Sequence, residues 1–195
     1  MHHAHVLGEA SGTLQARVLF VAEAVGRRGG AITGVPLTRD ESGKRFTRFL
    51  EAAGIARSES FITNAVLCNP IDERQRNRAP TSKEVARCRP FLTRTLEIVR
   101  PRVVVTLGQV ALESLRAIAP HDAHLRSDIG RPVAWHGRWL VPMYHPGRQS
   151  TLHRAHDAQM QDWRRLGPLI RGLTGGPRPP IGSATAGRNK QTLRV

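Results

Sequence analysis

Four short apolar runs, separated by segments with helical periodicity, constrain the fold of this chain more than any other feature. The runs cover residues 17–22, 60–66, 102–107 and 139–143, and each has the length of a strand. Runs that are apolar on both faces are typical of parallel strands buried between helices. Helical patterns follow the strands at residues 42–53, 81–99, 108–118 and 151–170. The alternation predicts a three-layer α/β/α fold with a small, mostly parallel, four-stranded central sheet.

Local signals place several ends of these elements. Thr81 and Glu84 have the spacing of a capping box, which predicts that a helix begins there. Pro90 lies inside the same helix and predicts a kink or a break. Pro142 lies in the last apolar run and indicates a sheet edge or a strand end.

The chain length suits one domain with one continuous core. We expect that domain to span residues 1–171 of the 195. Residues 172–195 are rich in Gly, Pro, Ser and Arg and have no apolar period, so they are predicted to form a disordered basic tail.

The charge balance indicates what the chain meets. Lys and Arg number 30 against 15 Asp and Glu, which gives a net charge of +15 and favours a polyanion such as nucleic acid. A solubilising surface or an Arg-rich codon usage would give the same composition. Two cysteines exclude a disulfide scaffold, and neither a membrane-spanning run nor a secretory signal is present. We expect a monomeric, cytoplasmic protein that does not bind membranes.

Polar and glycine-rich residues gather in three loops. Residues 23–41, 64–80 and 144–150 each follow a predicted strand. Ligands of parallel sheets bind beyond the carboxyl ends of the strands, so these loops are predicted to form the functional site.

Five segments in and beside these loops resemble the motifs of the uracil-DNA glycosylase superfamily, in the same order. They are Ala22-Glu23-Ala24-Val25-Gly26, Thr63-Asn64-Ala65-Val66, Arg78-Ala79-Pro80-Thr81, Arg100-Pro101-Arg102 and Tyr144-His145-Pro146-Gly147. The likeness is to the family four, iron–sulfur branch. It implies a monofunctional glycosylase for base excision repair, which flips deoxyuridine out of DNA and hydrolyses the N-glycosidic bond to release uracil.

The resemblance implies roles for two residues above all. The carboxamide of Asn64 matches N3–H and O4 of uracil, because it offers both an acceptor and donors. The imidazole of His145 would donate to uracil O2 as negative charge builds on the leaving base. Glu23, Ala24 and Gly26 would shape the pocket floor. Outside the family context, Asn64 reads as a strand-end cap and His145 as one of nine histidines.

The residue that activates water is less clearly indicated. Ala24 stands where the best-known branch has an aspartate. Asp40 is favoured for this role, because its segment resembles an acidic stretch of the cluster-free fifth branch, and Glu23 and Glu41 are alternatives. A helix cap explains Asp40 equally well.

Two further substitutions leave the base specificity open. Leu37 stands where the family has a phenylalanine that stacks on uracil, and Val25 replaces the motif proline. A catalytically weak binder of damaged DNA, or a glycosylase for hypoxanthine or xanthine, is therefore an alternative. A dinucleotide enzyme is disfavoured by the spacing of Gly26, Gly29 and Gly30.

Basic residues in the loops are candidates for DNA contacts. Arg27, Arg28, Arg148 and Gln149 are predicted to hold phosphates or to fill the gap left by the flipped base. Further candidates are Arg74, Arg76 and Arg78. Each of these charges also has an ordinary interpretation as a solvated loop residue.

The cysteines match only part of the family's metal site. Cys68 and Cys88 resemble two of the four ligands of its 4Fe–4S cluster, but the upstream pair is absent. His2, His3 and His5 lie near the vacant place, and mixed ligation would be unusual. We therefore expect no cluster and no other cofactor, and we expect pairing within residues 72–76 to hold the loop instead.

Overall fold

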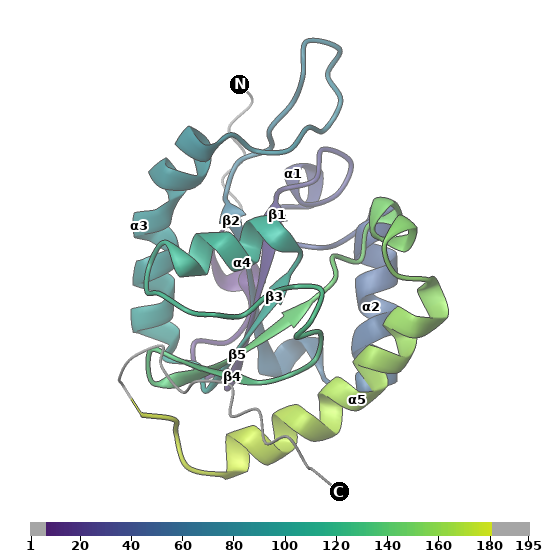
Figure 1. Cartoon of the computed structure of the whole chain (residues 1–195). Helices are drawn as coiled ribbons and strands as arrows, with labels where there is room; N and C mark the ends of the chain where they lie inside the picture. The colour runs from purple at the N-terminus through teal and green to yellow at the C-terminus, as the bar shows by residue number, and fades with distance from the viewer. Residues whose placement is uncertain (1–6, 181–195) are drawn as a thin grey trace, which may run out of the picture.

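The computed structural model describes residues 7–180 and has three layers, with a central sheet between two pairs of helices (Figure 1). The strands are β1 (Val18–Ala24), β2 (Ser60–Val66), β3 (Val103–Leu107), β4 (Val133–Trp135) and β5 (Arg138–Met143). They lie in the order β2-β1-β3-β5-β4. All neighbours are parallel except β4 and β5, so the predicted fold class is confirmed.

Helices α3 and α4 cover one face of the sheet, and α2 and α5 cover the other. The helices are α1 (Gly30–Thr33), α2 (Glu41–Ala53), α3 (Ser82–Val99), α4 (Gln109–Arg116) and α5 (His156–Gly175). Three short 3₁₀ helices complete the described chain: η1 (Glu9–Ser11), η2 (Arg57–Glu59) and η3 (Arg148–Leu152).

Alternate residues of each strand divide the interior into two cores. Leu19 and Val21 of β1 pack under α3 and α4, whereas Phe20 packs on the opposite face under α2 and α5. On that second face, Trp163 of α5 stacks on Phe20 and on Phe49 of α2. The two-residue period of a strand thus supplies both faces of the sheet with apolar side chains.

Helices α2 and α5 approach most closely at Gly167. A Cβ atom added there would lie 1.7 Å from the carbonyl oxygen of Ala53, the last residue of α2. Only glycine fits between the two helix backbones at this point.

Three local predictions need correction. The sheet has a fifth strand, β4, which is only three residues long and pairs antiparallel with β5. Pro142 is therefore not on an edge strand, although it lies at the end of β5, as the alternative prediction had it. It escapes a clash because β4 pairs only with residues 138–140, and the carbonyl of Pro142 instead accepts a hydrogen bond from Gly130. Helix α3 continues unbroken through Pro90.

The predicted tail also begins too early. Helix α5 extends to Gly175, and Arg102 donates a hydrogen bond to the carbonyl of Gly176. Arg178 donates to the carbonyl of Arg100 over 3.1 Å. Residues up to 180 therefore pack on the domain, and the rest of the expected tail lies outside the described residues. No helix between residues 7 and 180 has the length and apolar character that would cross a membrane.

Candidate active site

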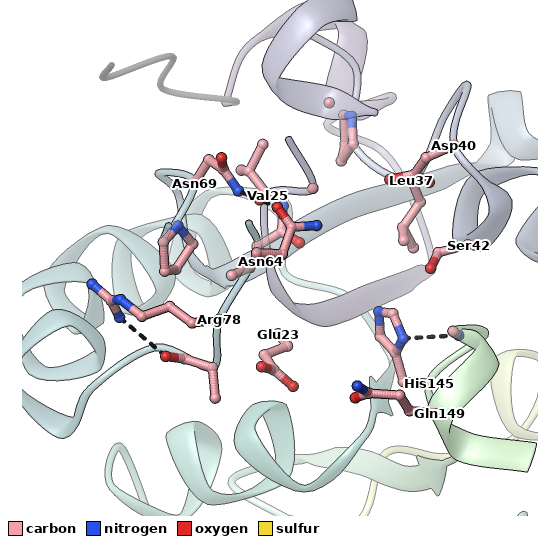
Figure 2. A pocket seen from close by; sticks show the side chains of 18 of the residues that line it. Glu23, Val25, Leu37, Asp40, Ser42, Asn64, Asn69, Arg78, His145 and Gln149 are labelled. Atoms are coloured by element: carbon pink, nitrogen blue, oxygen red, sulfur yellow. Dashed lines mark hydrogen bonds between the residues drawn. The ribbon is translucent and has the colours of Figure 1, made fainter. Parts of the chain in front are cut away.

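A cavity of about 600 Å³ opens at the carboxyl ends of β1, β2 and β5, where the three predicted loops meet (Figure 2). Nine of the predicted site residues line it: Glu23, Ala24, Gly26, Leu37, Asp40, Asn64, His145, Arg148 and Gln149. The volume is in the usual range for small-molecule sites, roughly 300–1,000 Å³. It can therefore hold a base together with its sugar.

Asn64 lines this cavity and has a buried amide oxygen without a partner in the described chain. It lies in β2 and is 2% exposed, beside Ala22 of β1 in the parallel register. Its Oδ1 atom is enclosed and accepts no hydrogen bond from any residue between 7 and 180. A buried polar atom without a partner is costly, so the site favours a ligand that donates to it.

His145 follows β5 and is held in one tautomer. Its Nδ1 atom accepts a hydrogen bond from the backbone N–H of Gly147 over 2.9 Å (Figure 2). Burial, together with the positive charge of Arg45, lowers the pKa of His145 to about 4. The neutral ring therefore carries its proton on Nε2, where it can act as a donor. A Cβ atom on Gly147 would lie 2.8 Å from Nδ1, so the close approach requires glycine.

Two residues that the sequence interpretation missed fix the histidine loop. The hydroxyl of Ser150 donates to the carbonyls of His145 and Gly147, at 2.6 and 2.7 Å. Gln159, buried in α5, donates to the same hydroxyl over 3.2 Å. A serine five residues after the histidine is the only sequence signal of this bracing, and nothing in the sequence singles out Gln159.

Two carboxylates border the cavity. Glu23 lies near the end of β1, and burial raises its pKa. Asp40 caps α2, because its Oδ1 accepts from the backbone N–H of Gly43 over 2.9 Å. Its Oδ2 lies against Gly26, where an added Cβ atom would meet it at 2.5 Å. The predicted cap is therefore present, and Asp40 also borders the cavity.

Leu37 provides an apolar wall in a strained backbone conformation. Its φ angle is +50°, in the left-handed region that side chains rarely adopt. Arg57 holds this segment, since its guanidinium donates to the carbonyls of Pro36 and Leu37. Strain of this kind persists only where the surroundings enforce it, which is typical of functional sites.

The loop between β2 and α3 closes one side of the cavity. Asn69 donates to the carbonyl of Val25 over 2.6 Å, and to Asn77 over 3.0 Å. Asn77 also accepts from the backbone N–H of Arg27. The expected pairing within residues 72–76 is present, because Arg76 and Asp72 form an ion pair at 2.7 Å.

The arginines predicted to contact DNA differ in their surroundings. Arg148 lines the cavity from η3, together with Gln149. Arg78 also lines the cavity, although its guanidinium forms a two-pronged pair with Glu84. Arg27 does not line it and donates to the carbonyl of Gln75. Arg28 and Arg74 are exposed and do not line the cavity.

Comparison with known proteins identifies the family. A family model described as the uracil DNA glycosylase superfamily matches residues 10–166. The chain belongs to the uracil-DNA glycosylase superfamily. The match spans every strand and the whole of the cavity lining, so the superfamily resemblance predicted from the motifs is confirmed.

Curated relatives within the superfamily are of two types. A type-4 uracil-DNA glycosylase of Archaeoglobus fulgidus is 30% identical over 163 residues, which is 81% of this chain and 79% of that protein. A type-4 enzyme of Thermotoga maritima is 34% identical and covers 72% of this chain and 69% of its own. A type-5 uracil-DNA glycosylase of Pyrobaculum aerophilum is 36% identical over 69% of this chain and 63% of its own length.

The type-4 relatives overturn the expectation that this superfamily member has no cofactor. Both relatives are named type-4 uracil-DNA glycosylases. Type 4 is the iron–sulfur branch that the motifs of this chain resemble, and that resemblance implies a 4Fe–4S cluster. The donor set of the described part does not complete such a cluster. Cys68 and Cys88 lie close enough for Cys88 to raise the pKa of Cys68 beyond the effect of burial. They supply two thiolates where four are needed, and residues 7–180 hold no cluster of three metal-binding side chains.

Proposed function

We propose that this chain excises uracil from DNA by flipping the deoxyuridine into the cavity and hydrolysing its N-glycosidic bond. One observation carries this proposal: Asn64 and His145, from the ends of different strands, line the same cavity. Each offers the hydrogen-bonding group that one edge of a uracil ring requires.

Asn64 reads the base. Its unpartnered Oδ1 accepts from N3–H of uracil, and its Nδ2 donates to O4. Cytosine presents the opposite pattern, with an acceptor at N3 and an amino group at C4. A cytosine in this cavity would leave the buried amide unpaired, which is the kind of mismatch that gives strong discrimination.

His145 stabilises the leaving base. As the bond from C1′ to N1 lengthens, negative charge collects on O2 of uracil. A neutral imidazole with its proton on Nε2 can donate a hydrogen bond to that oxygen. A donor fixed in advance at the site of developing charge is worth about 3–4 kcal/mol of transition-state stabilisation.

Asp40 assists the attack of water on the oxocarbenium-like sugar. Its carboxylate borders the cavity and is fixed by the cap of α2. Ala24 cannot hold a water molecule, and Glu23, whose pKa is raised by burial, is a weaker candidate because it is more easily protonated. The water oxygen forms a bond to C1′ of the sugar as the bond from C1′ to N1 breaks. The carboxylate of Asp40 accepts a proton from the water, and uracil leaves as the anion.

The DNA is the partner that these residues imply. Arg148 and the neighbouring Gln149 project from η3 at the rim, where they support the extruded nucleotide. The net charge of +15 adds attraction to the phosphate backbone. We further propose that the domain of residues 1–171, extended by the end of α5, acts as a monomer in the cytoplasm.

Excision is tested with labelled oligonucleotides that carry uracil, hypoxanthine or xanthine, followed by alkaline cleavage of abasic sites. Strand breaks in the uracil lane alone are the expected result. Breaks only with hypoxanthine or xanthine would transfer the activity to another base. Binding without breaks would identify a silent reader of damaged DNA, an outcome that Ala24 and Leu37 make worth testing.

A further inference from the structure

A second cavity, of about 470 Å³, lies between the first turns of α2 and α5 and the helix η3. It is lined by Glu41, Arg45, Arg48, Arg148, Thr151 and His156. Three arginines and one glutamate thus line it. A concave surface with such an excess of positive charge attracts anions.

Arg45 is the feature that marks this cavity as a built site. The residue is 7% exposed, and its Nε and Nη2 atoms have no hydrogen-bond partner within residues 7–180. Glu41, one turn earlier, forms no ion pair with Arg45 among residues 7–180. The guanidinium of Arg45 lies 5.9 Å from the ring centre of Phe49. A guanidinium stays charged, and burying it without a partner is costly, so Arg45 favours an anionic ligand.

The start of α5 adds donors to the same cavity. His156 is the first residue of the helix, and the preceding Ala155 provides no side-chain cap. The backbone N–H groups of the first turn therefore have no acceptor from a capping side chain, and the helix dipole places partial positive charge there. Arginines at a helix N-terminus form a set of donors suited to the oxygens of a phosphate.

Arg148 connects this cavity to the candidate active site, because it lines both. Arg45 also lies near enough to His145 for its charge to help lower the pKa of that histidine. We propose that the cavity around Arg45 binds a backbone phosphate of the DNA strand that carries the flipped nucleotide. The DNA as ligand rests on the proposed function, whereas the anion site rests on Arg45 itself.

Neutralising single phosphates tests the assignment. Duplexes carry a tetrahydrofuran abasic analogue, which needs no excision, and one methylphosphonate at successive positions of the same strand. Binding is measured for the wild-type protein and for Arg45→Met, which keeps the side-chain length but removes charge and donors. At one position, the methylphosphonate is expected to weaken wild-type binding about tenfold. The affinity of Arg45→Met should not fall further when the methylphosphonate is at that position. At every other position, the methylphosphonate should weaken binding by the two proteins equally.

Several results would overturn the proposal. The proposal is wrong if Arg45→Met binds the unmodified duplex as tightly as the wild-type protein. It is also wrong if the methylphosphonate weakens binding by the two proteins equally at every position. If inorganic phosphate raises the melting temperature of wild type but no methylphosphonate position distinguishes the variant, the cavity binds a free anion and not DNA.

Folding and activity are controlled separately. Removal of a buried, unpaired charge is expected to leave Arg45→Met at least as stable as wild type. Should that variant lack a native near-ultraviolet spectrum, Arg48→Gln replaces it, since Arg48 is exposed and lines only this cavity. The same position must then show a smaller penalty than in wild type. Because no uracil is cleaved in these measurements, failure of the excision assay would not affect their outcome.

Discussion

The backbone N–H of Gly147 donates to Nδ1 of His145, so the ring's single proton lies on Nε2. This bond joins residues only two apart, and Ser150 braces the same turn through two carbonyls. Together they preset the tautomer before any DNA is bound.

Removal of the Nε2–H donor of His145 should reduce the rate of excision more than the affinity for DNA. His145→Ala is expected to lower the single-turnover rate of uracil excision by about 10²–10³-fold, because a fixed donor to a developing oxyanion is lost. Affinity for duplex containing an abasic analogue should change by less than tenfold. His124→Gln, at an exposed histidine, is the matched control. A wild-type rate for His145→Ala would remove this residue from the mechanism.

The same histidine should make folding stability depend on pH. Its pKa in the folded protein is about 4, below the ordinary value of 6.5, so the unfolded chain takes up the proton first. Stability is therefore complete above about pH 6.5 and decreases as the pH falls towards 4, by up to about 3 kcal/mol. Urea unfolding at pH 7 and pH 4.5 measures this loss. His145→Gln should flatten it, and an equally steep profile in that variant would assign the loss to other groups.

Asn64 should be required for activity but not for folding. Because Oδ1 of Asn64 has no partner within the described chain, Asn64→Ala removes an unpaired buried polar atom and should leave the melting temperature unchanged or raised. Uracil excision should fall by at least ~100-fold, since the base edge loses its hydrogen bonds. Asn64→Asp should lose activity similarly, because a carboxylate cannot donate to O4. Large destabilisation by Asn64→Ala would instead indicate a structural role.

Two substitutions separate the roles of Asp40. Asp40→Asn keeps an oxygen that can accept from Gly43, so the cap of α2 and the melting temperature should be nearly preserved. Asp40→Ala should cost about 0.5–2 kcal/mol of stability through loss of the cap. If the carboxylate assists water, both variants lose excision rate by about 10²-fold or more. Full activity in Asp40→Asn would leave this residue as a helix cap only.

The pair between Arg78 and Glu84 should support the loop beside the cavity at neutral pH. The pKa of Glu84 is lowered to about 2, chiefly by the hydrogen bond from Arg78, so its contribution is present above about pH 4.5 and lost as the pH falls towards 2. Glu84→Gln should lower stability by about 1–2 kcal/mol at pH 7, and less at pH 3. Glu97→Gln breaks the exposed pair with Arg94 on the same helix and should cost under about 1 kcal/mol.

The sequence predicted the sheet well because its strands are buried on both faces and read as continuous apolar runs. It missed β4, since three residues are too few to stand out as a strand-length apolar run. The end of α5 was predicted too early because glycines such as Gly172 usually end a helix. Hydrogen bonds from Arg102 and Arg178 instead hold the residues after this glycine against the domain.

The candidate site was predicted where motifs carry the chemistry, as at Asn64 and His145. Residues that act through tertiary contacts have no such signal. Arg45 looks in sequence like one more surface arginine of an amphipathic helix. Only the folded chain shows that it is enclosed and that its Nε and Nη2 atoms have no hydrogen-bond partner among residues 7–180. Arg27 and Arg78, which are predicted to contact DNA, also form hydrogen bonds within the protein that no sequence signal indicates.

The crossing at Gly167 has a consequence for the arginine-lined cavity at the other end of the same two helices. Eleven residues separate Gly167 from His156, a rise of roughly 16 Å along α5. With the backbones in contact at the crossing, the two helices cannot approach each other more closely there. Gly167→Ala would therefore push the two helices apart at the crossing. The width of the arginine-lined cavity between Arg45 and His156 would change, although neither residue is substituted.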